Sequence, residues 1–165
     1  MEIELLQQER KHTVLTAGYC PDFSIDKREG YGVALDIGTT TIAAALLDLS
    51  SGKELAHASD INPQKQYGLD VLSRISYEYE KGDEGIRSLQ SILVHCLNRL
   101  LNELCESANV SRTELRDIVV AANCAMTHML LGEDANEITG GGLHEIEERT
   151  KSGNVTLVLT QNVGI

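Results

Sequence analysis

The sequence predicts an α/β domain in which strands come first and helices follow. Three observations carry this prediction: three β-prone runs separated by short turns, one long segment with apolar residues at helical spacing, and a later apolar run that leads into a second helical segment. With 165 residues, the chain is long enough for one domain with a substantial core and short for two.

The β-prone runs cover residues 31–36, 41–49 and 54–61. A turn that contains Gly38 separates the first two runs, and the polar turn at 50–53 separates the second from the third. Short turns of this kind join antiparallel neighbours. We therefore expect a three-stranded antiparallel meander.

The helical segments follow the meander. Asp70 precedes apolar residues at three- and four-residue spacing, which predicts a short helix. Ser111 and Glu114 have the spacing of a capping box. The strongest periodicity in the chain predicts a long amphipathic helix, whose apolar face consists of Ile86, Leu89, Leu93, Leu97, Leu100, Leu104 and Ala108.

A further strand and helix are predicted after this long helix. Residues 118–122 are all apolar, which is typical of a strand that is covered on both faces. Asn123 follows directly, and residues 125–131 are predicted to form a helix that ends at Gly132.

Composition and charge exclude several classes of protein. Hydrophobic residues make up 42% of the chain, as in a globular protein, and the formal net charge of −11 argues against a nucleic-acid-binding surface. No apolar run is long enough to span a membrane, and the acidic start of the chain does not have the pattern of a signal peptide. We expect a cytoplasmic protein without a membrane or nucleic-acid partner.

The cysteines do not indicate a metal cluster. They form no C-x-x-C pair and are widely separated, at Cys20, Cys96, Cys105 and Cys124. His95 with Cys96, or Cys124 with His128, can in principle ligate a metal ion. A core cysteine beside a surface or capping histidine is the simpler interpretation, and we expect no iron–sulfur or zinc site.

The turn at residues 36–41 has the composition of a phosphate site. It places a carboxylate, a glycine and three hydroxyl groups between two apolar runs. Backbone N–H groups and hydroxyls that converge on such a turn can hold phosphate oxygens, and an aspartate at a strand end can hold hydrated Mg²⁺. An ordinary hairpin turn has a similar sequence, so local pattern alone leaves both interpretations open.

Asn123 is the second candidate. A strand-to-helix junction leaves N–H groups unpaired at the helix start, so Asn123 and Cys124 would lie beside an anion at the Asp36 turn if the two strands are neighbours. Asparagine is also a favoured N-cap wherever it precedes a helix. Both interpretations stay open on chemistry alone.

Four blocks of the sequence occur in the order of one known family. They are residues 31–41 (YGVALDIGTTT), 62–64 (NPQ), 67–75 (YGLDVLSRI) and 122–132 (ANCAMTHMLLG). The blocks resemble the ATP-dependent reductive activators of corrinoid proteins, and the resemblance covers about residues 28–132. Together they are far more specific than the turn at residues 36–41, which a wider superfamily shares.

The resemblance implies a fold, cofactors and site residues. The fold would be the ribonuclease H-like half of an actin, sugar-kinase and heat-shock-chaperone ATPase, with ATP and Mg²⁺ as cofactors. Asp36 would organise Mg²⁺ through water, and Asn123 would face the cleft from the neighbouring strand end. The first phosphate loop would consist of Gly38, Thr39, Thr40 and Thr41.

Two residues in the matching blocks have open roles. Arg74 either reaches an anion or a partner, or is an exposed helical arginine paired with Asp70 at i,i+4. His128 lies where the family tends to have histidine, but a lone histidine on a short helix is more often a packing or capping residue than a catalyst.

The resemblance also divides the chain. Residues 31–132 would be the first half of the ATPase domain, and residues 1–30 a linker with the end of a preceding element. Residues 133–165 would be an acidic linker or helix and a short strand, either a remnant of the second half or a flexible linker with an acidic helix. A second phosphate loop, an adenosine loop and a [2Fe–2S] cysteine pattern are not identifiable, so whether the chain is an enzyme stays open.

Three functions are compatible with these observations. The first is a partial ATP-binding domain related to activators that couple ATP to reduction of a corrinoid methyltransferase protein. The second is a non-catalytic interaction module or gene remnant that binds a corrinoid protein or an iron–sulfur activator subunit. The third is a sugar- or acetate-kinase-like fragment. Loss of the opposing half would uncover apolar surface, which predicts self-association or a partner.

Overall fold

The computed structural model describes residues 29–135 and the backbone of residues 155–159. The predictions for residues 1–28, the glycines at 140–142 and the following acidic segment lie outside the described residues. In chain order the elements are β1 (Tyr31–Ile37), β2 (Thr41–Asp48), β3 (Lys53–Ile61), the 3-10 turn η1 (Pro63–Gln66), α1 (Val71–Lys81), α2 (Asp83–Ala108), the 3-10 turn η2 (Arg112–Glu114), β4 (Leu115–Ala122), α3 (Cys124–Leu131) and β5 (Val155–Leu159).

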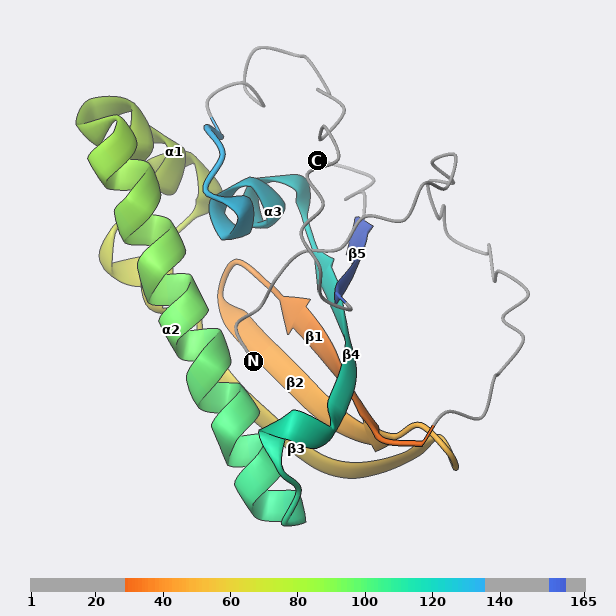
Figure 1. The fold of residues 1–165 in the computed structure, drawn as a ribbon. Coiled ribbons are helices and arrows are strands. Elements are labelled where there is room, and N and C mark those ends of the chain that lie inside the picture. Colours follow the sequence, from red (N-terminus) through yellow and green to blue (C-terminus); the bar gives the residue numbers. More distant parts are fainter. Residues whose placement is uncertain (1–28, 136–154, 160–165) are drawn as a thin grey trace, which may run out of the picture.

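The five strands form one sheet in the order β3-β2-β1-β4-β5 (Figure 1). β1 pairs antiparallel with β2, and β2 with β3, which confirms the predicted meander. β4 lies on the other side of β1 and runs parallel to it, and β5 continues the sheet parallel to β4. This mixed sheet agrees with the ribonuclease H-like half that the family resemblance implies.

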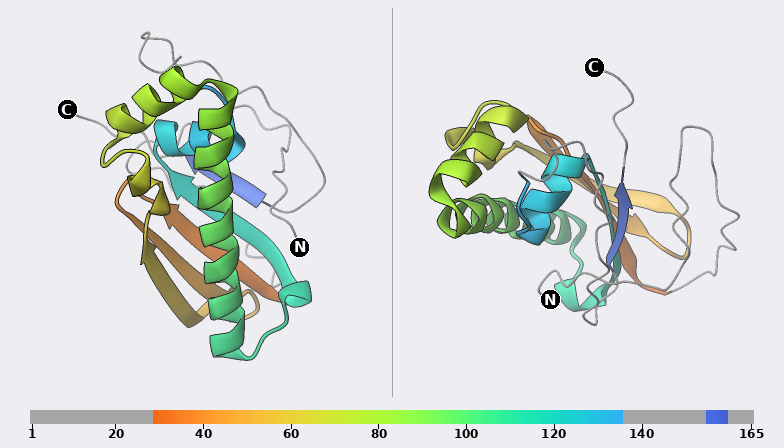
Figure 2. Two further views of the ribbon diagram at one scale, coloured as in Figure 1. Left: turned by 90° about the vertical axis from the view of Figure 1, so that its left-hand side faces the viewer. Right: turned by 90° about the horizontal axis from the view of Figure 1, so that it is seen from above.

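The three helices lie on the same side of the sheet (Figure 2). In β1, Val33, Leu35 and Ile37 are buried on this side, whereas Ala34 and Asp36 are exposed on the other. This alternation follows from the two-residue period of a strand. The apolar core therefore lies between one face of the sheet and the helices.

β4 shows where the sequence prediction fails. Val120 is buried, but Val119 is 40% exposed, so the expectation that residues 118–122 are covered on both faces is wrong. The reason is that the described helices pack against one face only. Val119 pairs with Ala34, which pairs in turn with Ala45, so the second face carries small apolar side chains.

The long amphipathic helix is confirmed as α2. It begins at Asp83, where two acidic residues in the first turn suit the positive end of the helix dipole, and it ends at Ala108, followed by the C-cap Asn109 in the left-handed conformation. Its inner face supplies much of the core, with Leu89, Leu93, Leu97, Leu100, Leu101 and Leu104 all fully buried. Burial of this stripe, more than helix propensity, holds α2 in place.

The predicted starts of the smaller elements are also present. Asp70 caps α1 by accepting a hydrogen bond from the Ser73 N–H, at 2.8 Å. Ser111 and Glu114 form a capping box around η2, as their spacing predicts. α1 and α2 meet at a close approach, because a Cβ atom at Gly85 would lie 3.0 Å from the Glu78 Cα.

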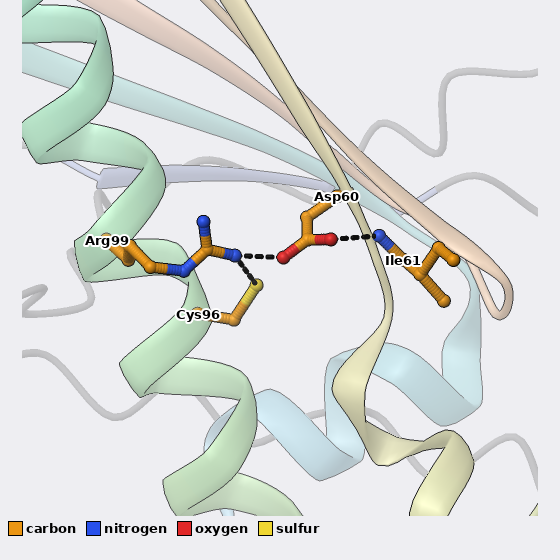
Figure 3. A network of polar contacts seen from close by, with 4 residues as sticks. All are labelled: Asp60, Ile61, Cys96 and Arg99. Atoms are coloured by element: carbon orange, nitrogen blue, oxygen red, sulfur yellow. Dashed lines mark hydrogen bonds and ion pairs between the residues drawn. The ribbon is translucent and has the colours of Figure 1, made fainter.

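A polar contact fixes α2 to the edge strand β3. The Arg99 guanidinium donates to the Asp60 carboxylate, whose other oxygen accepts a hydrogen bond from the Ile61 N–H at 2.7 Å (Figure 3). The same Arg99 nitrogen lies 3.8 Å from the Cys96 sulfur. Both charged side chains are about half exposed, so this pair contributes little stability.

The part of the chain that the structure describes contains no helix that is long and apolar enough to cross a membrane.

Candidate functional site

The candidate phosphate loop lies between β1 and β2 at one end of the sheet (Figure 1). The Gly38 N–H donates to the Thr41 carbonyl at 3.0 Å and closes the turn. A Cβ atom at position 38 would lie 2.7 Å from that same carbonyl oxygen. The turn therefore requires glycine at this position for close backbone approach.

Replacing Gly38 with alanine is expected to lower the free energy of unfolding by about 1–3 kcal/mol, because the added methyl group collides with backbone and not with a flexible side chain. Urea denaturation measures the change. A variant as stable as the parent would show that the turn is wider than described.

The carbonyl groups of the loop are held from behind by protein donors. The Asn62 side-chain amide donates to the Gly38 carbonyl at 2.9 Å, and the Asn62 N–H donates to the Thr40 carbonyl at 2.8 Å. Arg74 donates to the Thr39 carbonyl at 2.7 Å. Each of these carbonyl oxygens is thus occupied by a group on the inner side of the loop.

The N–H groups of Thr39 and Thr40, by contrast, find no acceptor among the described residues. Thr40 and Thr41 are exposed and Thr39 is half-buried. Unclaimed backbone N–H groups beside exposed hydroxyls form the kind of concavity that accepts a phosphate oxygen.

Asp36 lies at the end of β1, two residues before Gly38. Its register neighbours are Ala43 on β2 and Ala121 on β4. The side chain is exposed on the uncovered face of the sheet, and within the described ranges no hydrogen bond or ion pair engages its carboxylate. Its oxygens are available to a hydrated cation.

Asn123 reaches the loop because β1 and β4 are neighbours. The interpretation of Asn123 as part of an anion site requires this arrangement. Ile37 and Ala122 pair in register, so the two strand ends lie side by side. The Asn123 oxygen accepts from the Met126 N–H at 2.9 Å and caps α3, while its nitrogen donates to the Thr39 hydroxyl at 3.3 Å. Asn123 therefore serves as cap and as neighbour of the loop at once.

Sequence reasoning missed the inner support of the loop. Asn62, Gln64 and Arg74 are all fully buried polar residues. Gln64 donates to the Leu89 carbonyl at 3.0 Å and accepts from Arg74 at 3.3 Å. Their position in the blocks that carry the resemblance could have marked them as site residues. Nothing local in the sequence predicts that these polar side chains are buried.

The exposed-arginine interpretation of Arg74 is wrong. The side chain is 0% exposed, and its hydrogen bonds go to the loop, to Gln64 and to the Gly68 carbonyl. Asp70 is instead occupied in capping α1 through Ser73. Burial explains these contacts, because a guanidinium that is removed from water needs protein acceptors for its N–H groups.

His128 is a buried packing residue in the structure, and its functional role stays open. It is 7% exposed and its Nδ1 donates to the Cys124 carbonyl at 2.8 Å, with the Cys124 sulfur 3.7 Å away. Burial raises the pKa of the Cys124 thiol, which disfavours a reactive thiolate. In the described ranges no group of three or more candidate ligands could hold a metal ion.

The sheet order and the loop at the β1–β2 junction define a half-domain of the actin-like ATPase fold. A family model described as the RACo middle region matches residues 31–157, and the chain belongs to this family.

Two activators of corrinoid proteins and one more distant protein resemble the chain. The corrinoid activation enzyme RamQ of Eubacterium limosum is 32% identical over 126 residues, which are 74% of this chain and 21% of that protein. A solved reductive activator for corrinoid, iron-sulfur protein is 38% identical, with a TM-score of 0.61 over 66% of this chain and 17% of its own. An archaeal actin homologue is 15% identical, with a TM-score of 0.40 over 82% of this chain and 45% of its own. The chain thus spans about a fifth of the length of RamQ and of the reductive activator.

Proposed function

We propose that this chain binds Mg-ATP through the loop at residues 38–41 and takes part in the ATP-dependent activation of a corrinoid protein. The observation that carries the proposal is the pair of unclaimed N–H groups on Thr39 and Thr40, with Asp36 at the end of β1 and Asn123 in contact with Thr39. The relatives support the second part, since one is named as a corrinoid activation enzyme and another as a reductive activator for a corrinoid, iron-sulfur protein.

Each residue of the site has a distinct task in this proposal. The loop N–H groups and the exposed hydroxyls of Thr40 and Thr41 would bind phosphate oxygens. Asp36 would hold Mg²⁺ through water, and the ion would neutralise phosphate charge. Asn123 would fix the Thr39 side chain at the edge of the site, as its 3.3 Å contact indicates.

The binding of Mg-ATP can be tested with an aspartate variant. Replacing Asp36 with asparagine is expected to weaken Mg-ATP binding about tenfold or more, because the amide cannot hold the hydrated cation as a carboxylate does. Isothermal titration calorimetry measures the dissociation constant. Asp83→Asn is the control, because Asp83 is exposed at the start of α2, away from the loop.

Two results would contradict the proposal. One is equal affinity of the parent and the Asp36→Asn variant. The other is a parent that fails to bind Mg-ATP at millimolar concentration while circular dichroism shows that it is folded.

A non-catalytic interaction module is the second candidate, and the surface of α1 favours it. Leu69, Leu72 and Tyr79 are 82%, 68% and 80% exposed. The spacing of Leu72 and Tyr79 places them on the outer side of α1, opposite the buried Arg74, and Leu69 lies just before the helix. Large apolar side chains gathered on one helix face are typical of a protein contact.

Pull-down with a purified corrinoid protein or an iron–sulfur activator subunit, with ATP hydrolysis measured in parallel, separates the two candidates. Partner binding that Leu72→Ser and Tyr79→Ser abolish, without any nucleotide binding, supports the interaction module. Self-association through the uncovered sheet face is a further proposal, and sedimentation at rising protein concentration measures it.

We also propose a cytoplasmic location. Cys96, Cys105 and Cys124 are all free thiols in the structure, which suits a reducing compartment.

A further inference from the structure

Arg74 is a buried cation behind the phosphate loop. Its side chain is 0% exposed and points from α1 towards the turn between β1 and β2. Three hydrogen bonds to oxygen atoms hold it: Nε donates to the Gly68 carbonyl at 2.9 Å, Nη1 to the Gln64 side chain at 3.3 Å, and Nη2 to the Thr39 carbonyl at 2.7 Å. The guanidinium is therefore fixed in one orientation.

All of these hydrogen-bond partners are neutral. Two are backbone carbonyls, one is a side-chain amide, and Nη1 also lies 3.6 Å from the Met126 sulfur. The negative charge of Asp70 acts on Arg74, but the exposed Asp70 carboxylate accepts its hydrogen bond from the Ser73 N–H. Within the described residues, no carboxylate forms an ion pair with Arg74.

A buried charge without an opposite charge is costly, because it loses its hydration and gains only dipoles in return. Arginine stays protonated even so. The positive charge thus remains in a region of low dielectric, where its field reaches farther than in water. The side of the loop that faces away from Arg74 carries the unclaimed N–H groups of Thr39 and Thr40.

We propose that Arg74 is a positioning residue whose buried positive charge, which has no ion-pair partner among the described residues, also raises the affinity of the loop for a polyphosphate. The hydrogen bond to the Thr39 carbonyl holds the peptide so that the next N–H faces outward. The charge adds long-range attraction for the phosphate end of a nucleotide. This inference rests on the proposed phosphate-binding role of the loop, and it names the chain of phosphates as the part of the ligand that is recognised.

The charge and the hydrogen bonds can be separated with two variants. Arg74→Lys keeps the charge and loses the fork of hydrogen bonds, whereas Arg74→Met fills similar volume and loses both. Arg87→Met is the matched control, because Arg87 is an exposed arginine on α2 that pairs with the equally exposed Asp83. Dissociation constants for tripolyphosphate, Mg-ATP, Mg-ADP and adenosine are measured by calorimetry for each variant.

Arg74→Met is expected to weaken tripolyphosphate and Mg-ATP binding about tenfold, Mg-ADP binding less, and adenosine binding not at all. Arg74→Lys is expected to recover a large part of this loss, and Arg87→Met to match the parent. A purely structural role would weaken all nucleotides alike and give no recovery with lysine, and that result would overturn the inference.

Some variants at a buried site fail to fold, so a second measurement uses the unmodified chain. The ¹⁵N resonances of the Arg74 guanidinium are expected to shift when tripolyphosphate saturates the loop. Unchanged resonances at saturation would also overturn the inference. If tripolyphosphate binds and depends on Arg74 while Mg-ATP does not bind, the inference stands and the proposed ATP function fails. If Mg-ATP binds equally well to the parent and to Arg74→Met, the inference about Arg74 fails and the proposed ATP function stands.

Discussion

Replacing Leu97 with alanine is expected to lower the free energy of unfolding by about 3 kcal/mol, within a usual range of about 2–5 kcal/mol. Leu97 lies in the middle of α2 and is 0% exposed within the core cluster. The change removes buried apolar contacts and leaves a cavity that the surrounding structure fills only partly. Urea denaturation followed by circular dichroism measures the loss.

Leu72→Ala is the matched control for this change. Leu72 is also a helical leucine, but it is 68% exposed on α1. Its truncation is expected to change stability by no more than about 0.5 kcal/mol. Equal losses for Leu72 and Leu97 would contradict the assignment of α2 as the helix that covers the sheet.

The second large effect is a pH dependence that arises from Glu78. This residue lies on α1 and is 1% exposed. One carboxyl oxygen accepts a hydrogen bond from the Ala135 N–H at 3.1 Å, while the other finds no hydrogen-bond partner among the described residues. Burial, with a smaller contribution from the negative charge of Asp134, raises the pKa of Glu78 from 4.5 to about 7.

The direction of the effect follows from the two pKa values. Between about 4.5 and 7 the folded chain binds a proton at Glu78 that the unfolded chain has already released. Stability therefore falls as the pH rises through this window, and the loss is complete above the folded pKa. One pKa unit corresponds to about 1.4 kcal/mol, so the loss amounts to at most about 3–4 kcal/mol.

Glu78→Gln is expected to remove this dependence, because glutamine keeps an acceptor for the Ala135 N–H and carries no charge. Unfolding free energies of parent and variant are compared at about pH 5 and pH 8, where the difference between them should grow with pH. The exposed Glu80→Gln on the same helix is the control. A parent and a Glu78→Gln variant with parallel pH profiles would contradict the raised pKa.

Local sequence patterns predicted much of the fold. Turn residues marked the ends of the strands in the meander, and the helical spacing of leucines identified α2. Both signals are local, because they depend only on residues that are close in the sequence. The pattern failed at Val119, since five apolar residues in a row do not tell whether a second layer covers them. That information lies in the packing of other elements.

The candidate site was predicted only in part, because some of its residues have a local sequence signature and others do not. Asp36 and the loop at residues 38–41 have a local signature, and Asn123 follows from its place after a strand. Asn62, Gln64 and Arg74 have polar side chains that sequence patterns assign to the surface. Only the tertiary contacts with the loop show that they are buried.

The hydrogen bonds behind the loop have a consequence for the thermodynamics of binding. Because Asn62 and Arg74 already fix the peptide groups of residues 38–40, the loop has little conformational entropy left to lose when a ligand arrives. Its empty and occupied shapes should be nearly the same. The loop is thus preorganised, and association does not have to wait for it to rearrange.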